Sequence, residues 1–200
     1  FRFFRFTASH GGERLDPEGL AACQDAAGRL DHISAERVGA EMWRMLGLAK
    51  VALTLAVMSE IGLLALSRDT LAALVRYEAL GGAGAAARLS IVAGGDLDAF
   101  QERWRLSNAV VDTAKRIEAA AKLASADQIA RAVYAFREDA IEALAVAAAE
   151  ENWPRERLME SAREFGRLPD PTIPVSGKDL LASGIKAGPE VGKTLARLET

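Results

Sequence analysis

The sequence predicts an all-α fold in which a multi-helix body is followed by a small C-terminal helical hairpin. Hydrophobic residues make up 50% of the 200 residues but aromatic residues only 6%, and the helix-favouring alanine, leucine, arginine and glutamate are abundant. Apolar residues recur at spacings of three and four, and capping residues and glycines mark helix starts and stops. A chain of this length can form one large domain with a small appendage.

Charge and residue usage exclude several classes of function. The formal net charge of −3 creates no overall field that attracts nucleic acid or anionic lipid, so RNA binding would require local patches. Cys23 is the only cysteine, which excludes an internal disulfide and favours a reducing, cytoplasmic setting. His10 and His32 are too few and too scattered for a zinc site. Charged residues and glycines interrupt the apolar run 46–66, which predicts a buried helix pair rather than a membrane span.

The N-terminal stretch FRFFRFT reads as the end of a helix. Phe3 and Phe6 share one helical face, and Arg2 and Arg5 share another. One interpretation is an amphipathic helix that buries phenylalanine and exposes arginine. The other is an RNA or nucleotide contact, since arginine pairs with phosphate and aromatic rings stack on bases. No cap precedes these residues, so we expect the chain to begin in the middle of a helix that ends within 1–14.

Two helix starts follow in close succession. Asp16 is a predicted N-cap followed by Pro17 at the first helical position, and this helix should extend to about residue 30. Ser34 is the next predicted N-cap, before a stripe of apolar residues at helical spacing: Val38, Met42 and Met45. Arg37 lies in the first turn of this second helix, where a cation opposes the helix dipole. Its position therefore predicts an external anion or a buried acidic partner.

The rest of the body, to residue 167, reads as further helices separated by glycines. We expect helix starts at Asp69, at a capping box formed by Ser125 and Gln128, and at Asn152–Pro154. A stripe of apolar residues at helical spacing predicts a further helix between them: Val110, Ala114, Ile117 and Ala121.

The segment GGDLD at 94–98 imitates a nucleotidyl-transfer site, in which two aspartates hold divalent metal after a glycine turn. Here the glycines adjoin the aspartates and the chain continues into a helix, so Asp96 is better explained as an N-cap. No Ser-His-Asp or Cys-His arrangement and no phosphate-binding P-loop occurs in the sequence. We therefore expect no catalytic residue, no metal site and no cofactor in this chain.

The C-terminal part contains a predicted connector and a predicted hairpin. Residues 168–174 contain three prolines in seven residues, which favours an extended connector. In the tail, 175–200, Ser176 and Asp179 form a predicted capping box with a Val175–Leu180 hydrophobic staple. The first short helix should stop at Gly184, and Gly188-Pro189-Glu190 should start the second.

The turn of this hairpin suits an anion. Lys186 in the turn and Lys193 one turn into the second helix flank the free amides of a helix N-terminus, including that of Gly188. Two interpretations are open. The hairpin either has a purely structural role, with glycines that let two helices approach, or it grips a nucleic-acid backbone.

Three segments together resemble one family. They are FRFFRF at 1–6, LDPEGLAACQDAAGRLDHISAERVGAEMWRML at 15–46 and SGKDLLASGIKAGPEVGKTL at 176–195. Their order and separation are similar to the C-terminal neck, body and tail of bacterial CCA-adding enzymes, which are tRNA nucleotidyltransferases, and of the related poly(A) polymerases. The resemblance implies that 1–14 ends a neck helix and that an RNA-binding region lies at about 15–75.

The resemblance also implies that tRNA is the partner and that catalysis takes place in another part of the parent enzyme. The parent enzyme adds C, C and A to tRNA from CTP and ATP, using Mg²⁺ in a catalytic head that would lie upstream, so this chain alone should be inactive and should bind tRNA. No membrane contact and no small-molecule site are expected, and the surface left by the head could drive self-association. There are two alternatives to a CCA-adding enzyme. The chain could be the RNA-binding part of a related poly(A) polymerase, or a helix-hairpin-helix nucleic-acid-binding or structural module that is not part of an enzyme. The candidate tRNA contacts are Arg2, Arg5, Arg37, Lys178, Lys186, Gly188 and Lys193.

Overall fold

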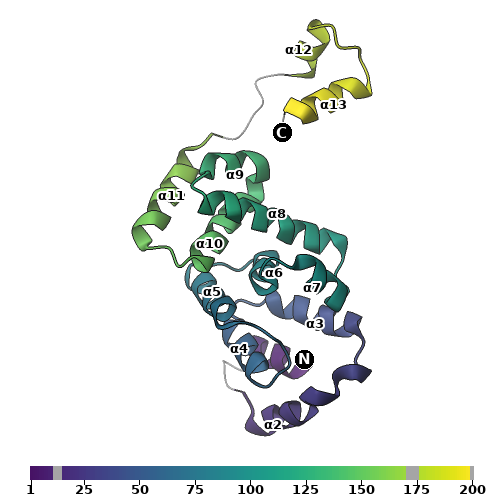
Figure 1. Ribbon diagram of the computed structural model, residues 1–200, viewed down its shortest axis with the longest axis vertical. Coiled ribbons are helices and arrows are strands. Elements are labelled where there is room, and N and C mark those ends of the chain that lie inside the picture. Colours follow the sequence, from purple (N-terminus) through teal and green to yellow (C-terminus); the bar gives the residue numbers. More distant parts are fainter. Residues whose placement is uncertain (11–14, 170–175, 199–200) are drawn as a thin grey trace.

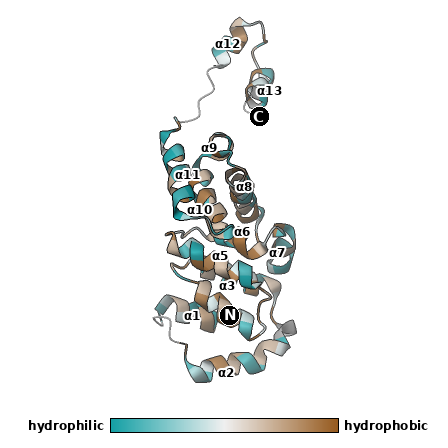
Figure 2. Ribbon diagram, turned by 60° about the vertical axis from the view of Figure 1, so that its left-hand side comes forward, coloured by the Kyte–Doolittle hydropathy of each residue, from teal (hydrophilic) through white to brown (hydrophobic). Residues whose placement is uncertain are grey.

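The computed structural model describes residues 1–10, 15–169 and 176–198, and this part of the chain contains helices and no strand (Figure 1). The predicted all-α fold is confirmed. Within the same residues no helix is both long enough and apolar enough to cross a membrane. Figure 2 shows the hydrophobic residues of the body gathered on the faces where its helices meet.

The N-terminal helices begin where the capping residues predict. They are α1 (Arg2–His10), α2 (Pro17–Ala26), the 3-10 helix η1 (Ala27–His32) and α3 (Ala35–Leu46). Asp16 accepts a hydrogen bond from the backbone N–H of Gly19, and Ser34 accepts one from that of Arg37. The expected helix from Pro17 to about residue 30 is wrong in its second half. It becomes a 3-10 segment after Ala26, because Arg29 has non-helical dihedral angles of −127° and 42°.

The body continues with two groups of helices. The first comprises α4 (Ala52–Glu60), α5 (Arg68–Ala79), α6 (Ala85–Ala93) and α7 (Leu97–Trp104). The second comprises α8 (Asn108–Ser125), α9 (Ile129–Phe136), the 3-10 turn η2 (Arg137–Asp139), α10 (Ala140–Glu150) and α11 (Arg155–Arg167). Helix α8 contacts α6, α9 and α10 and lies at the centre of the body. The buried positions of its predicted stripe are confirmed, with Ala114, Ile117 and Ala121 at most 4% exposed.

Several predicted helix boundaries are wrong, for local reasons. The apolar run 46–66 contains the single helix α4 between two turns, not a helix pair. Ser67 caps α5 by accepting from the N–H of Thr70, which places Asp69 inside the first turn instead of at the cap. Ser125 belongs to the last turn of α8, so it makes no capping box with Gln128. In contrast, Asp96 is confirmed as the N-cap of α7, since it accepts from the N–H of Ala99.

The start of α11 also differs from the expectation. The helix begins at Arg155 with Pro154 at the N-cap position, and Pro154 has no side-chain acceptor for a capping bond. Asn152 has a positive φ of 52°. This left-handed conformation, which asparagine tolerates better than most residues, turns the chain between α10 and α11 rather than capping a helix.

A buried arginine–glutamate pair connects the two loops nearest the centre of the body. Arg88, which is 0% exposed, donates to five carbonyl oxygens in the loops that follow α3 and α5: Leu46, Leu48, Ala49, Gly82 and Ala83, at 2.7 to 3.2 Å. Its Nε lies 3.5 Å from Glu78 Oε1. Burial lowers the pKa of the Arg88 guanidinium, and the charge of Glu78 opposes that effect.

Glu78 gives α4 the cap that its own sequence lacks. Val51, at the N-cap position of α4, has no side-chain hydrogen bond to the helix. Instead, Oε1 of Glu78 accepts from the backbone N–H groups of Val51 at 2.7 Å and Ala52 at 3.2 Å. A carboxylate at this position satisfies free amides and interacts favourably with the helix dipole. The pair therefore fixes where α4 starts relative to α3 and α5.

The last two helices, α12 (Gly177–Ala182) and α13 (Pro189–Leu198), contact each other and form a helical hairpin. The capping box of Ser176 and Asp179 is confirmed, with both reciprocal hydrogen bonds present. Gly184 ends α12 with a φ of 94°, a value that favours glycine. Residues 170–174 of the expected connector at 168–174 and the staple residue Val175 lie outside the described residues, so the division into body, connector and tail stays a prediction.

Candidate nucleic-acid interface

Three arginines converge on Glu41, which joins α1 to α3. Arg5 Nε lies 2.6 Å from Glu41 Oε2, Arg2 Nε lies 3.4 Å from Oε1, and Arg44 Nη1 lies 3.2 Å from the same Oε1. The Glu41 side chain is 9% exposed and that of Arg5 is 21% exposed, whereas Arg2 is 78% exposed. The hydrogen bond from Arg5, its charge and the contacts of Arg2 lower the pKa of Glu41 despite its burial. Arg5 is therefore largely committed to the fold, and Arg2 presents its charge to solvent.

The face of α1 that points outward differs from the amphipathic expectation. Phe4 is the phenylalanine that is fully buried, while Phe6 is 53% exposed. The guanidinium of Arg5 lies 4.5 Å from the centroid of the Phe6 ring, and the rings of Phe6 and His10 are 6.3 Å apart. The reason is the position of Glu41, which draws Arg5 inward and leaves Phe6 outside. Helix α1 thus carries an exposed aromatic pair beside exposed positive charge.

Arg37 is exposed in the first turn of α3. Its position predicts either a buried acidic partner or an external anion. Among the described residues Arg37 forms no ion pair, so the acidic partner is not found there. Its guanidinium is available for an external anion at a helix N-terminus, where backbone amides also favour negative charge.

The tail carries the remaining sequence-predicted contacts. Lys178, Lys186 and Lys193 are exposed, and within the described part of the chain none of them forms an ion pair. Gly188 has a φ of 141° and precedes the N-terminus of α13. The predicted contacts thus fall into two groups, one on α1 and α3 and the other on the tail, which lie toward opposite ends of the long axis in Figure 1.

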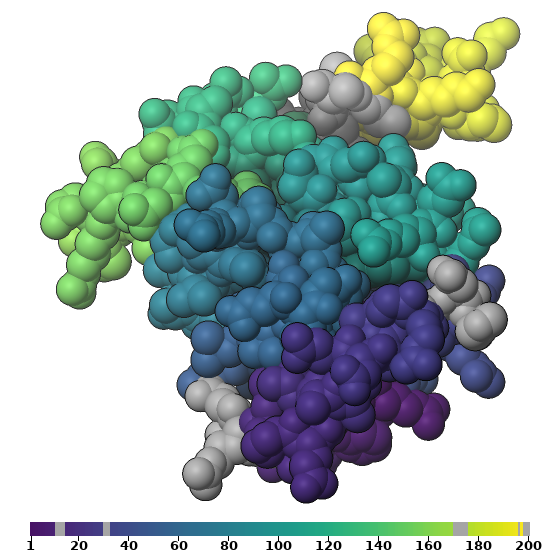
Figure 3. All heavy atoms as spheres, turned by 60° about the horizontal axis from the view of Figure 1, so that its bottom comes forward, coloured from purple at the N-terminus to yellow at the C-terminus, as the bar shows by residue number. Residues whose placement is uncertain are grey.

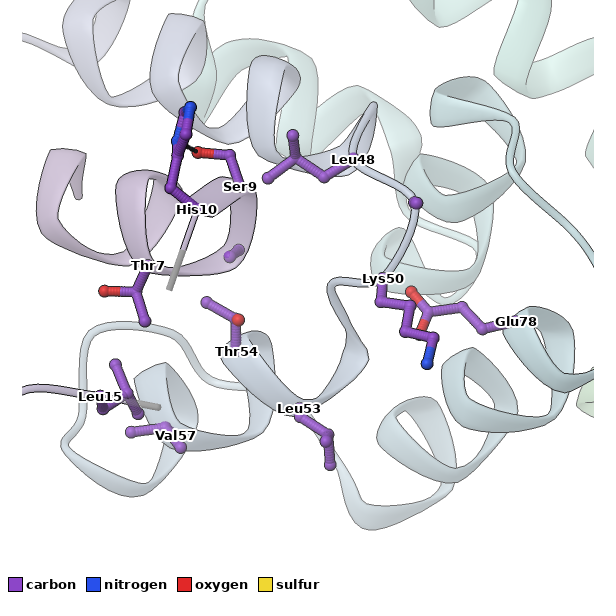
Figure 4. Close-up of a pocket in the computed structure, with 12 residues that line it drawn as sticks. Thr7, Ser9, His10, Leu15, Leu48, Lys50, Leu53, Thr54, Val57 and Glu78 are labelled. Carbon is purple, nitrogen blue, oxygen red and sulfur yellow. Dashed lines mark hydrogen bonds between the residues drawn. The ribbon is translucent and has the colours of Figure 1, made fainter. Parts of the chain in front are cut away.

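An open cavity of about 740 Å³ lies between the end of α1, the loop after α3 and the first turns of α4 (Figure 4). It was not predicted, because its walls come from segments that are separate in the sequence and carry no common motif. Its lining residues are Thr7, Ala8, Ser9, His10, Leu15, Leu48, Ala49, Lys50, Leu53, Thr54, Val57 and Glu78.

Glu41 was also missed, although a signal for it is present. It lies three residues after Val38 and four before Met45, within the apolar stripe of α3. A carboxylate on a buried face requires a cationic partner, and Arg2 and Arg5 are one helical turn apart on α1. The same logic applies to Arg88, a single charge in the otherwise apolar helix α6.

Comparisons with known proteins agree with this arrangement. Residues 14–74 match the family described as the probable RNA- and SrmB-binding site of polymerase A. Figure 3 shows much of this segment, in purple and blue, on one face of the molecule. Over 98% of its length, the chain is similar to the crystal structure of the Bacillus stearothermophilus CCA-adding enzyme in complex with CTP, with 29% sequence identity and a TM-score of 0.64.

The chain spans 54% of the length of that enzyme chain, and no curated protein sequence matches it. The resemblance inferred from the three sequence segments is confirmed by the family match and by the structural likeness. The chain is therefore similar to the CCA-adding enzyme and poly(A) polymerase family, in the sequence of 14–74 and in its fold.

Proposed function

We propose that this chain is the tRNA-binding C-terminal part of a CCA-adding tRNA nucleotidyltransferase. The observation that carries the proposal is the likeness to the solved CCA-adding enzyme along 98% of the chain. The match of 14–74 to an RNA-binding family supports RNA as the partner. A folded tRNA offers phosphates and 2′-hydroxyl groups rather than readable base edges, so recognition would be by shape.

The proposed contacts are exposed cations in the two groups described above. Arg2 and Arg37, with Arg5 behind them, would contact one part of the tRNA. Lys178, Lys186 and Lys193, with the amide of Gly188, would contact another. Two separated groups on an elongated molecule suit a long, folded RNA better than a short oligonucleotide.

We assign no step of nucleotidyl transfer to this chain. Asp96 caps α7, and Asp98 pairs with Lys115 at 2.7 Å, so neither is arranged with the other as a metal-binding pair. Mg²⁺, CTP and ATP would act in a catalytic head elsewhere in the parent enzyme.

A poly(A) polymerase of the same family is the second candidate. The specific observation in its favour is the family description, which names polymerase A. Both candidates require RNA binding by this chain and differ in the RNA that is bound.

Reversing the charge of two tail lysines tests the proposed tRNA surface. The double variant Lys186→Glu/Lys193→Glu should weaken tRNA binding and reduce the slope of log K against log salt by about two, roughly one unit per lost phosphate contact. The slope is measured by filter binding across a salt series, with far-UV circular dichroism to confirm that the helices persist.

The matched control is Arg131→Glu/Arg163→Glu, which makes the same change in net charge on α9 and α11. Both arginines are exposed, and neither belongs to the proposed contacts. This control should leave the slope nearly unchanged. Equal slopes of log K against log salt for wild type and the tail variant would contradict the proposed contacts and indicate that the hairpin has a purely structural role.

A further inference from the structure

The cavity beside α1 has the form of a ligand site. Its volume of about 740 Å³ lies within the ~300–1,000 Å³ typical of small-molecule sites, which are mostly apolar with a few polar groups. Leu15, Leu48, Leu53 and Val57 provide apolar walls (Figure 4). Leu53 lines the cavity and is 61% exposed, so a ligand can reach its side chain.

Two polar groups at this cavity, on Thr54 and His10, have no hydrogen-bond partner among the described residues. The Thr54 hydroxyl makes no hydrogen bond with the residues that the structure describes. His10 shares its Nδ1 with Ser9 Oγ at 2.6 Å, which leaves Nε2 without a partner in that same part of the chain. Lys50 adds a positive charge to the lining, beside Glu78 in Figure 4. The cavity therefore combines apolar walls with a donor or acceptor on two sides, and Lys50 and Glu78 add one charge of each sign to its lining.

We propose that this cavity binds one unpaired nucleotide of the RNA, with the base against the leucine side chains and its polar edge toward Thr54 and His10. The assignment rests on the proposed function, since it names a contact within RNA binding. A nucleobase has two apolar faces and a polar rim, and RNA-binding proteins commonly hold such bases splayed out of the strand. A phosphate alone would not suit walls made of leucine and valine.

The surroundings favour a nucleotide over an apolar protein segment. The exposed Phe6 ring lies next to His10 on α1, so a neighbouring base has an aromatic surface on which to stack. Arg2 and Arg44 are exposed on the adjacent helices and complement a phosphodiester backbone. In addition, more than half of the lining residues belong to the 14–74 segment that matches an RNA-binding family. An amphipathic helix would instead require a row of apolar pockets.

The test compares two short RNAs on the full chain and on a variant with a blocked cavity. The probes are fluorescein-labelled hexaadenylate and a hexamer of the same backbone whose riboses lack bases, and affinity is measured by fluorescence anisotropy at low salt. Wild type should bind hexaadenylate at least about fivefold more tightly, since stacking of a base contributes on this order or more. Leu53→Trp should reduce the hexaadenylate affinity to that of the abasic hexamer, because the larger indole takes the place of the base at the apolar wall.

Leu80→Trp is the matched control, because Leu80 is 43% exposed and does not line the cavity. It should change either affinity by less than about twofold. Thr54→Val, which keeps the volume and removes the hydroxyl, should weaken hexaadenylate binding by about fivefold, the value of one hydrogen bond.

Equal affinities of wild type for the two hexamers, or an unchanged hexaadenylate affinity in Leu53→Trp, would overturn the assignment. Binding of an apolar peptide that Leu53→Trp abolishes while hexaadenylate still binds would overturn it too. The proposed function would survive each of these results as long as wild type binds tRNA and the tail lysines set the salt slope. Loss of all tRNA binding by wild type would instead refute the proposed function itself.

Discussion

Replacing Arg88 by methionine should lower the free energy of unfolding by about 4 kcal/mol, a large share of the ~5–15 kcal/mol that a domain possesses. Methionine has a similar length and fills much of the space, but it donates no hydrogen bond. The five carbonyl oxygens that Arg88 now satisfies would be left without that donor. Glu78, whose side chain is only 13% exposed, would also lose its contact with the Arg88 cation, and buried polar groups are costly to leave without partners.

Urea denaturation followed by tryptophan fluorescence measures this loss, since Trp104 is buried in the body at 1% exposure. Arg68→Met is the control, because Arg68 is exposed at the start of α5 and its removal should change stability by no more than about 0.5 kcal/mol. Similar midpoints for the two variants would show that the loops after α3 and α5 do not depend on Arg88.

The substitution Gly39→Ala should lower the free energy of unfolding by about 3 kcal/mol. A Cβ atom built at Gly39 would lie 1.8 Å from the backbone oxygen of Trp104 and 2.8 Å from its carbonyl carbon. Backbone atoms cannot rotate away as a flexible side chain can, so Gly39→Ala must push α3 and α7 apart. Overpacking of this kind typically costs ~1–3 kcal/mol, and a clash with backbone belongs at the upper end.

The same glycine-to-alanine substitution at Gly166 should stabilise the protein instead of destabilising it. Gly166 lies in α11, and a Cβ there would meet no atom within 4 Å. Gly166→Ala should therefore raise stability by about 0.5 kcal/mol, because alanine loses less backbone freedom on helix formation. Both variants are compared in one urea series. If Gly39→Ala is as stable as Gly166→Ala, then Gly39 does not lie against the backbone of Trp104, and the packing of α3 on α7 described here is wrong.

Local signals in the sequence were sufficient for much of the fold. Asp16, Ser34, Asp96 and Ser176 cap the helices that they were expected to cap, because a capping residue and the amides it satisfies lie within one turn of the chain. The boundary errors came from competing local signals. Ser67 stands two residues before Asp69 and serves as the cap in its place.

Interactions between distant segments could not be located in the same way. Helix α4 is capped by Glu78, which lies 27 residues beyond Val51, and no pattern near α4 identifies that carboxylate. The orientation of Arg5 depends on Glu41, 36 residues away. Amphipathic spacing alone therefore places Arg5 outside and Phe6 inside, the reverse of what is found, whereas Arg2 is exposed as that spacing predicts. The cavity beside α1 was missed for the same reason, since four separate segments form it: 7–10, Leu15, 48–57 and Glu78.

The candidate contacts were predicted individually but not as a surface. Periodicity and dipole arguments selected Arg37, Lys186 and Lys193, and each is exposed. The relative positions of Arg2 and Arg37 required the structure, because contacts between α1 and α3 bring their helices together. The sequence offers no reason to distinguish Arg2 from Arg5. In the structure their exposures differ, because Arg5 forms the shorter ion pair with Glu41 and is more buried by it.

A comparison of tRNA with duplex DNA of equal length most directly tests whether this chain is a tRNA-binding unit. Filter binding at two salt concentrations gives both affinities for the full chain. The proposal predicts that tRNA binds more tightly than the duplex at both concentrations, because recognition of a folded RNA uses its shape and 2′-hydroxyl groups as well as its charge. Equal affinities for tRNA and duplex DNA would contradict it.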